Sequence, residues 1–161
     1  GQYWTVMQGE HIHTYMTAIG MVSICSDGHS VTAVYLPCEN LPAMEDREDD
    51  ITSQASEEID EYLSGRRKKF DVPVYQEGTE FQMDVWNAVC AIPYGKTATY
   101  GEIAETIGRP GASRAVGTAC GLNRIPLIIP CHRVVPKDST GNYAGGRTLK
   151  IRLLTIEKEY R

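Results

Sequence analysis

The chain has 161 residues, of which 42% are hydrophobic and 23% charged, a composition typical of a globular protein of one domain or two small ones. No stretch approaches the roughly 18 unbroken apolar residues of a membrane span, and the start does not resemble a signal peptide, so we expect a cytoplasmic, nucleoid-associated protein without membrane contact. The five cysteines are odd in number and irregularly spaced, which argues against a disulfide framework and favours reduced thiols.

The net charge of −5 conceals a strong asymmetry between the two halves of the chain. Residues 1–80 carry 15 acidic and 5 basic side chains, a net charge of −10, whereas residues 81–161 carry 6 acidic and 11 basic side chains, a net charge of +5. Because phosphate backbones attract basic surfaces, only the second half is electrostatically suited to nucleic acid. The alternative interpretation is an uneven distribution of ordinary surface charge.

The first half of the chain has the pattern of a small sheet with a covering helix. Apolar-rich runs at 14–18, 21–26 and 31–36 predict strands, and Gly28 supplies the positive φ of a tight hairpin between the last two. Five apolar positions then fall on one helical face: Ile51, Ala55, Ile59, Tyr62 and Leu63. Gly65 is placed to end this helix.

Two further features of this half bear on its fold and on metal binding. The extended segment 70–75, with Pro73 inside it, favours an edge strand or an interdomain connection. Residue types that bind zinc also lie near one another in the sequence: His11, His13, Cys25 and His29. Because finger-like spacing is absent, no metal site is predicted, although the sequence does not exclude zinc here.

The second half begins with helical signals. Thr79 and Gln82 form a capping-box pattern ahead of an apolar face that contains Trp86, for which a place in the core is the best interpretation. Thr99 and Glu102 repeat the capping-box pattern at the start of a second helix.

A third helix is expected after the break at Gly108–Gly111. Residues 112–121 are dominated by Ala and Gly, and Arg114 is the one long cationic side chain among them. Helix, short turn and helix together suggest a helix-turn-helix. An interior Gly such as Gly117 costs about 1 kcal/mol relative to Ala, so this thin surface serves either tight helix packing or close approach to nucleic acid.

Cys131 is the candidate nucleophile. The tripeptide Cys131-His132-Arg133 lies between the apolar runs 127–129 and 134–135, where polar groups need a reason for burial. An adjacent His can lower a thiol pKa from about 8.5 and so favour the nucleophilic thiolate. The other cysteines are interpreted as small core hydrophobes: Cys25, Cys38, Cys90 and Cys120.

The motif Pro130-Cys131-His132-Arg133-Val134, with Asn123 before it and residues 141–146 after it, resembles the O6-alkylguanine-DNA alkyltransferases, also called methylated-DNA-protein-cysteine methyltransferases. The likeness runs from about Thr79 to Tyr160, while the first half fits only in its strand and helix pattern. The resemblance implies an α/β N-terminal support domain (1–75), with a small antiparallel sheet and a covering helix. It also implies a mainly α, winged-helix-like helix-turn-helix domain (76–161) that binds DNA and transfers the alkyl group.

The resemblance further implies roles in catalysis. Cys131 accepts the alkyl group, a relay of His132, water and Glu157 removes its proton, and Asn123 braces the turn that carries it. Tyr100 stabilises the departing guanine. Arg133 is expected to be an internal structural partner.

The resemblance also implies contacts to DNA and to the base. Arg114 is expected to fill the gap left by a flipped nucleotide while the thin helix presses into the minor groove. The expected DNA contacts are Thr99, Tyr100, Ala112, Ser113, Arg114, Ala115 and Gly117. The expected contacts to the alkylated base are Pro126, Val134, Tyr143, Ala144 and Gly145. Ala144 stands where other members have Ser, so the backbone N–H is left to contact O6.

The function expected from the resemblance is single-turnover repair by a monomer, without a cofactor, of double-stranded DNA that contains O6-alkylguanine. O4-alkylthymine is expected to be a poorer substrate. Three alternatives remain open from the sequence: a sensor that binds alkylguanine without transfer, a helix-turn-helix regulator and a Cys-His hydrolase. The presence of Cys131 argues against the sensor, and the scarcity of Asn, Gln and Arg in the thin helix argues against the regulator.

Overall fold

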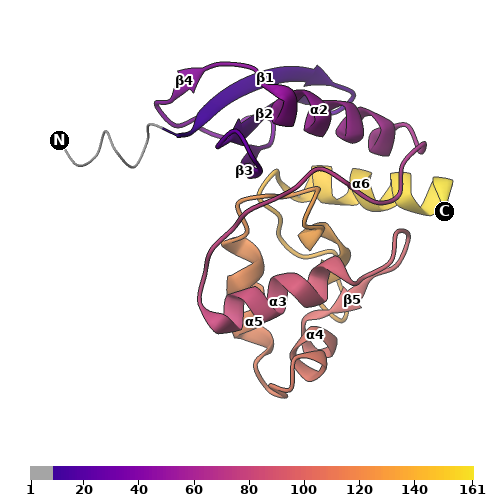
Figure 1. The fold of residues 1–161 in the computed structure, drawn as a ribbon. Coiled ribbons are helices and arrows are strands. Elements are labelled where there is room, and N and C mark those ends of the chain that lie inside the picture. The colour runs from indigo at the N-terminus through magenta and orange to yellow at the C-terminus, as the bar shows by residue number, and fades with distance from the viewer. Residues whose placement is uncertain (1–8) are drawn as a thin grey trace. The chain divides into compact units, whose positions relative to one another are not determined.

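The computed structural model describes residues 9–161, and the chain divides into two compact units, residues 1–76 and 77–161 (Figure 1). Within the described part, no helix has both the length and the apolar character needed to cross a membrane. Each unit has its own core, and each is described separately below.

The first unit contains a four-stranded sheet in the order β3-β2-β1-β4. Strands β1 (His11–Thr17), β2 (Gly20–Ser26) and β3 (Val31–Tyr35) pair in antiparallel fashion, and Gly28, with φ of 93°, lies in the turn predicted between β2 and β3. The short strand β4 (Glu45–Asp46) adds to β1 in parallel. The sheet is therefore mixed rather than purely antiparallel. The sequence did not predict β4, because this strand lies in an acidic stretch without a strand pattern.

Helix α2 (Asp50–Leu63) packs on this sheet and contacts β1, β2 and β3 (Figure 1). Four of the five predicted apolar positions are buried, namely Ala55, Ile59, Tyr62 and Leu63, and Ile51 is half-buried. Gly65, with φ of 79°, follows the helix as expected. The segment 70–75 extends the edge of the sheet, because the N–H of Val31 donates to the carbonyl of Pro73.

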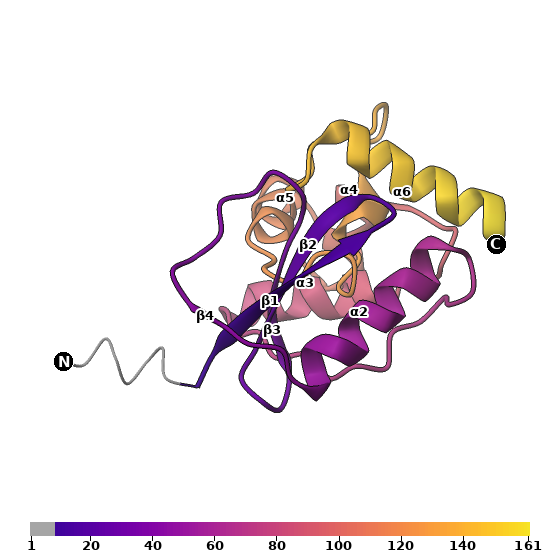
Figure 2. The same ribbon diagram turned by 90° about the horizontal axis from the view of Figure 1, so that it is seen from above.

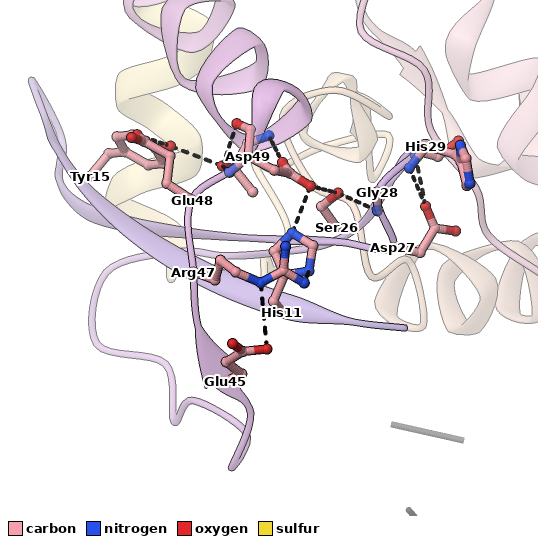
Figure 3. Close-up of polar contacts among 12 residues, drawn as sticks. His11, Tyr15, Ser26, Asp27, Gly28, His29, Glu45, Arg47, Glu48 and Asp49 are labelled. Atoms are coloured by element: carbon pink, nitrogen blue, oxygen red, sulfur yellow. Dashed lines mark hydrogen bonds and ion pairs between the residues drawn. The ribbon is translucent and has the colours of Figure 1, made fainter. Parts of the chain in front are cut away.

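A polar network joins β1, β2 and the start of α2 (Figure 3). Asp49 caps the helix, and its Oδ2 lies 2.6 Å from Nε2 of the buried His11 and accepts from the Ser26 hydroxyl at 2.8 Å. The Arg47 guanidinium lies 3.1 Å from Nδ1 of His11. Among residues 9–161 no three His, Cys, Asp or Glu side chains gather as metal ligands would, and His11 serves the helix cap.

The second unit contains three helices that pack on one another: α3 (Glu80–Cys90), α4 (Tyr100–Thr106) and α5 (Ser113–Gly121) (Figure 2). Both predicted capping boxes are present, at the starts of α3 and α4. Trp86 is buried in the core, and its indole N–H donates to the carbonyl of Ala119 at 2.9 Å. This bond ties α3 to α5.

The remaining elements of this unit surround the Cys-His-Arg tripeptide. Strand β5 (Ala98–Thr99) pairs in parallel with β6 (Val134–Val135), which directly follows the 3-10 helix η1 (Cys131–Arg133). Helix α6 (Arg147–Tyr160) packs against η1. The tripeptide is thus enclosed between a strand and a helix.

The interpretation of four cysteines as core hydrophobes is correct only for Cys25, which is buried in the first unit. Cys38 is exposed in a loop, where it adopts φ of 72°, and Cys90 is exposed at the last residue of α3. Cys120 is half-buried. The interpretation failed at these three positions because burial of a single cysteine depends on contacts that no local pattern reports.

Candidate active site

Cys131 is held in a tight backbone turn. Its N–H donates to the carbonyl of Ile129 at 2.8 Å, and the N–H of Arg133 donates to the carbonyl of Pro130 at 2.9 Å. Leu127 enters the turn with φ of 73°, a conformation that is unfavourable for a bulky residue and needs support from its surroundings. The Cys131 side chain is 7% exposed. The turn therefore presents one thiol at a defined position.

Asn123 braces this turn. Its Nδ2 donates to the carbonyl of Ile129 at 3.0 Å and to Sγ of Cys131 at 3.2 Å, while its Oδ1 accepts from the N–H of Ile125 at 3.0 Å. An N–H donor directed at sulfur favours the thiolate over the thiol. The side chain thus orients the nucleophile and also stabilises its charged form.

Glu157 of α6 collects three donors behind the thiol. Its Oε2 lies 2.6 Å from Nε2 of His132, while Oε1 accepts from Nε of Arg133 at 2.9 Å and from the N–H of Gly95 at 3.0 Å. Arg133 also donates to the carbonyl of Ile92 at 2.9 Å. The carboxylate is 1% exposed, so its charge is balanced inside the protein by Arg133.

The pKa shifts at the site define its resting protonation. Contact with the Cys120 thiol, followed by burial, raises the pKa of Cys131, and the bond from Asn123 opposes this rise only in part. Burial lowers the pKa of His132 although Glu157 acts in the other direction. At neutral pH the site therefore rests as a thiol beside a neutral imidazole, which can accept the thiol proton.

A cavity of about 540 Å³ opens over Cys131. Tyr100, Arg114 and Gly117 from helices α4 and α5 contribute one side of its wall. Burial raises the pKa of Tyr100, so its hydroxyl stays protonated and can donate a hydrogen bond. The cavity is large enough to hold a purine with a small alkyl group.

Other predicted base contacts also line the cavity. Pro126, Tyr143 and Ala144 belong to its wall, together with Asn123. Val134 is buried in β6, and Gly145 lies in the loop before α6. In the part of the chain that the structure describes, Val134 and Gly145 do not line the cavity.

The remaining predicted DNA contacts lie at the starts of α4 and α5. Thr99 caps α4, and Ala112 occupies the cap position of α5. Ser113 is half-buried, whereas Ala115 is exposed on α5, as is Arg114. The structure thus places these residues on the helix-turn-helix, and Arg114 also lines the cavity.

Lys150 is a site residue that the sequence reasoning missed. It is 1% exposed, and its Nζ donates to the carbonyl of Val134 at 2.7 Å and to the carbonyl of Asn142 at 3.2 Å. Burial lowers its pKa. Lys150 therefore ties the loop that carries Tyr143 to the strand after Cys131. Helical periodicity treats Lys as a surface residue, so no sequence signal pointed to it.

Comparison with known proteins identifies the family of this chain. Residues 80–159 match the family model of the 6-O-methylguanine DNA methyltransferase, DNA binding domain, and residues 11–76 match that of the 6-O-methylguanine DNA methyltransferase, ribonuclease-like domain. The inducible methylated-DNA--protein-cysteine methyltransferase of Bacillus subtilis is 39% identical over 161 residues, which cover 97% of this chain and 90% of the relative. The chain belongs to the 6-O-methylguanine DNA methyltransferase family.

Two further proteins with similar sequence or structure support the same family. The methylated-DNA--protein-cysteine methyltransferase of Methanosarcina acetivorans is 53% identical over 106 residues, covering 65% of this chain and 67% of the relative. The crystal structure of Mycobacterium tuberculosis OGT in complex with DNA matches with a TM-score of 0.87 and 38% identity, covering 93% of this chain and 94% of that one. The resemblance seen in the sequence, and the fold class it implied, are thereby confirmed.

Proposed function

We propose that this protein repairs double-stranded DNA by transferring the alkyl group of O6-alkylguanine to Cys131, once per molecule. The observation that carries the proposal is the Cys131 thiol in the wall of an open cavity, with Asn123 bonded to its sulfur and the His132–Glu157 pair behind it. Membership of the 6-O-methylguanine DNA methyltransferase family supports the same activity.

The transfer begins with deprotonation of Cys131. With Nε2–H of His132 donating to Glu157, Nδ1 is the basic nitrogen and takes the thiol proton, through a water in the expected relay. Glu157 then stabilises the imidazolium. The thiolate attacks the alkyl carbon, so that a C–S bond forms while the C–O6 bond breaks and its electron pair leaves with the guanine.

The departing guanine carries the negative charge until it is protonated. Tyr100 lines the cavity and keeps its proton at neutral pH, so it is placed to donate to the base as that charge develops. The thioether has no leaving group that the site could displace. One equivalent of alkyl group therefore consumes one molecule of protein, and no cofactor is needed.

DNA contact is assigned to α5. A Cβ added at Gly117 would meet only ordinary contacts with the Tyr100 ring, at 3.7 Å and 3.8 Å, and one at Gly121 would meet nothing within 4 Å. Packing inside the protein therefore does not require either glycine. Close approach to a DNA groove is the remaining explanation, and the net basic charge of residues 81–161 supports it.

A stacked guanine cannot reach a thiol at the base of a cavity, so the nucleotide has to leave the duplex. Arg114 is exposed on α5 and also lines the mouth of the cavity, a place from which it can fill the gap in the stack. O4-alkylthymine, which presents a similar alkylated edge, is a poorer second substrate in this proposal. The protein acts as a monomer, because every proposed group comes from one chain.

Intact-mass measurement after mixing with a duplex that contains O6-methylguanine tests the proposal. The expected result is one added methyl group per protein, located on Cys131 by peptide mapping. Cys131→Ser should bind the duplex without gaining mass. Repeated turnover, or a methyl group on another cysteine, would contradict single transfer to Cys131.

A further inference from the structure

Two thiols lie side by side in the wall of the cavity, although alkyl transfer uses only one of them. Cys120 comes from the last turn of α5 and Cys131 from the start of η1, and both residues line the cavity. The two thiols interact, because each changes the pKa of the other. Cys120 is half-buried, so the pair can be reached by small molecules that enter the cavity.

Asn123 holds the two backbone segments together. Its N–H donates to the carbonyl of Cys120 at 3.2 Å, and its Nδ2 donates to Sγ of Cys131, also at 3.2 Å. One residue thus fixes the end of α5 relative to the nucleophile. A disulfide bond needs the two sulfurs about 2.05 Å apart, and rotation of the two side chains can bring neighbouring thiols to this distance.

We propose that Cys120 is a resolving cysteine, and that Cys120 and Cys131 form a reversible disulfide when the protein meets a peroxide. The modification site is the cavity itself. The proposal depends on the two thiols and their geometry, and it would hold even if the alkyl substrate were different. While the disulfide is present, Cys131 cannot accept an alkyl group, and reduction restores it.

The chemistry is balanced with hydrogen peroxide as the oxidant. The Cys131 thiolate attacks one peroxide oxygen, forming an S–O bond and breaking the O–O bond, which gives a sulfenic acid and hydroxide. The proton that the thiol released converts this hydroxide to water. The Cys120 thiol then attacks Sγ of Cys131, forming the S–S bond and displacing the oxygen as a second water. Two thiols are oxidised by two electrons in total, and one peroxide is reduced to two waters.

Without a resolving thiol, a sulfenic acid at Cys131 is exposed to a second peroxide and becomes an irreversible sulfinic acid. Each protein molecule has one alkyl acceptor, so irreversible oxidation would remove it from repair. Cys90 is a competing thiol, because it is exposed at the end of α3 and open to peroxide. The disulfide partner must therefore be identified by mapping rather than assumed.

The test treats the full chain with hydrogen peroxide, without DNA, and measures intact mass and mapped peptides. The expected product is a monomer that has lost two hydrogens, with Cys120 linked to Cys131, and dithiothreitol should return both the mass and the methyl-transfer capacity. Cys90→Ser should behave in the same way. Cys120→Ser should instead gain oxygen atoms on Cys131 and should not recover with dithiothreitol.

If the Cys120 variant fails to fold, the peroxide products of the parent protein are sufficient to test the proposal. A Cys131 that gains two oxygens in the parent, links to Cys90, links between molecules or remains a thiol would overturn the proposal. Cys131→Ser should form no disulfide at Cys120, since the sulfenic acid is then not made. Because the readout is thiol oxidation, failure here is distinguishable from failure of alkyl transfer.

Discussion

Replacing Glu157 by Gln should slow alkyl transfer strongly, for two reasons that the structure separates. The carboxylate is 1% exposed and contacts both His132, at 2.6 Å, and Arg133, at 2.9 Å. A neutral amide withdraws support from the imidazolium, and loss of general-base assistance typically costs about 10²–10⁴ in rate. It also leaves the charge of Arg133 buried without its partner.

The second effect is a loss of stability. Removing one partner of a buried ion pair costs about 3–5 kcal/mol, a large part of the roughly 5–15 kcal/mol that stabilises a typical protein. Slow transfer by Glu157→Gln could then reflect partial unfolding. The double variant Glu157→Gln with Arg133→Met removes both charges and should recover much of the lost stability, because an apolar replacement of a buried pair is often near neutral.

Single-turnover rates on an O6-methylguanine duplex, with thermal unfolding of each variant, distinguish the two effects. We expect the double variant to regain melting temperature but not rate, because His132 still lacks its carboxylate. A double variant that transfers methyl nearly as fast as the parent would refute the relay. Glu157 would then act only through Arg133.

Four other predictions follow from particular contacts. Arg114→Ala should slow repair of duplex DNA much more than reaction with a free alkylated guanine base, and equal losses would argue against a role in base extrusion. Lys150→Met should remove the hydrogen bonds to the carbonyls of Val134 and Asn142 and so loosen the loop that follows Cys131. Proteolysis within residues 136–146 should then become faster, while the far-ultraviolet circular dichroism is retained. Because burial lowers the pKa of His132, the rate of transfer should persist as pH falls below the ordinary imidazole value of about 6.5 and decline only further into acid; a decline centred at or above 6.5 would contradict a neutral buried base. Burial alone would raise the pKa of Asp49, but hydrogen bonds from Thr52, Ser26 and His11 outweigh it, so the folded-state pKa lies below the unfolded value. The stability that the ionised Asp49 contributes is present above about pH 3.9 and is lost as pH falls through the folded pKa. The melting temperature of Asp49→Asn should therefore be below that of the parent at pH 7 and converge with it in acid.

Local sequence determined much of the architecture. The capping boxes at Thr79 and Thr99, the hairpin glycine Gly28 and the apolar face of α2 all act over a few residues, so their patterns predicted the elements that the structure contains. The assignment of Cys131 as the nucleophile rests on the family resemblance of the surrounding motif, and it stays a prediction. Its neighbours His132 and Arg133 are adjacent in sequence, and the structure brings both to Glu157.

Tertiary structure alone decided the features that depend on distant segments. The pairing of β4 with β1 joins residues without a strand pattern, and the burial of Lys150 reverses what helical periodicity predicts. The sequence predicts a core position for Cys120, yet the structure places it in the wall of the cavity together with Cys131. A local pattern reports backbone preference and the direction of a side chain on its own element. Which side chains meet is determined by long-range packing, and the chemistry of the thiol pair arises only there.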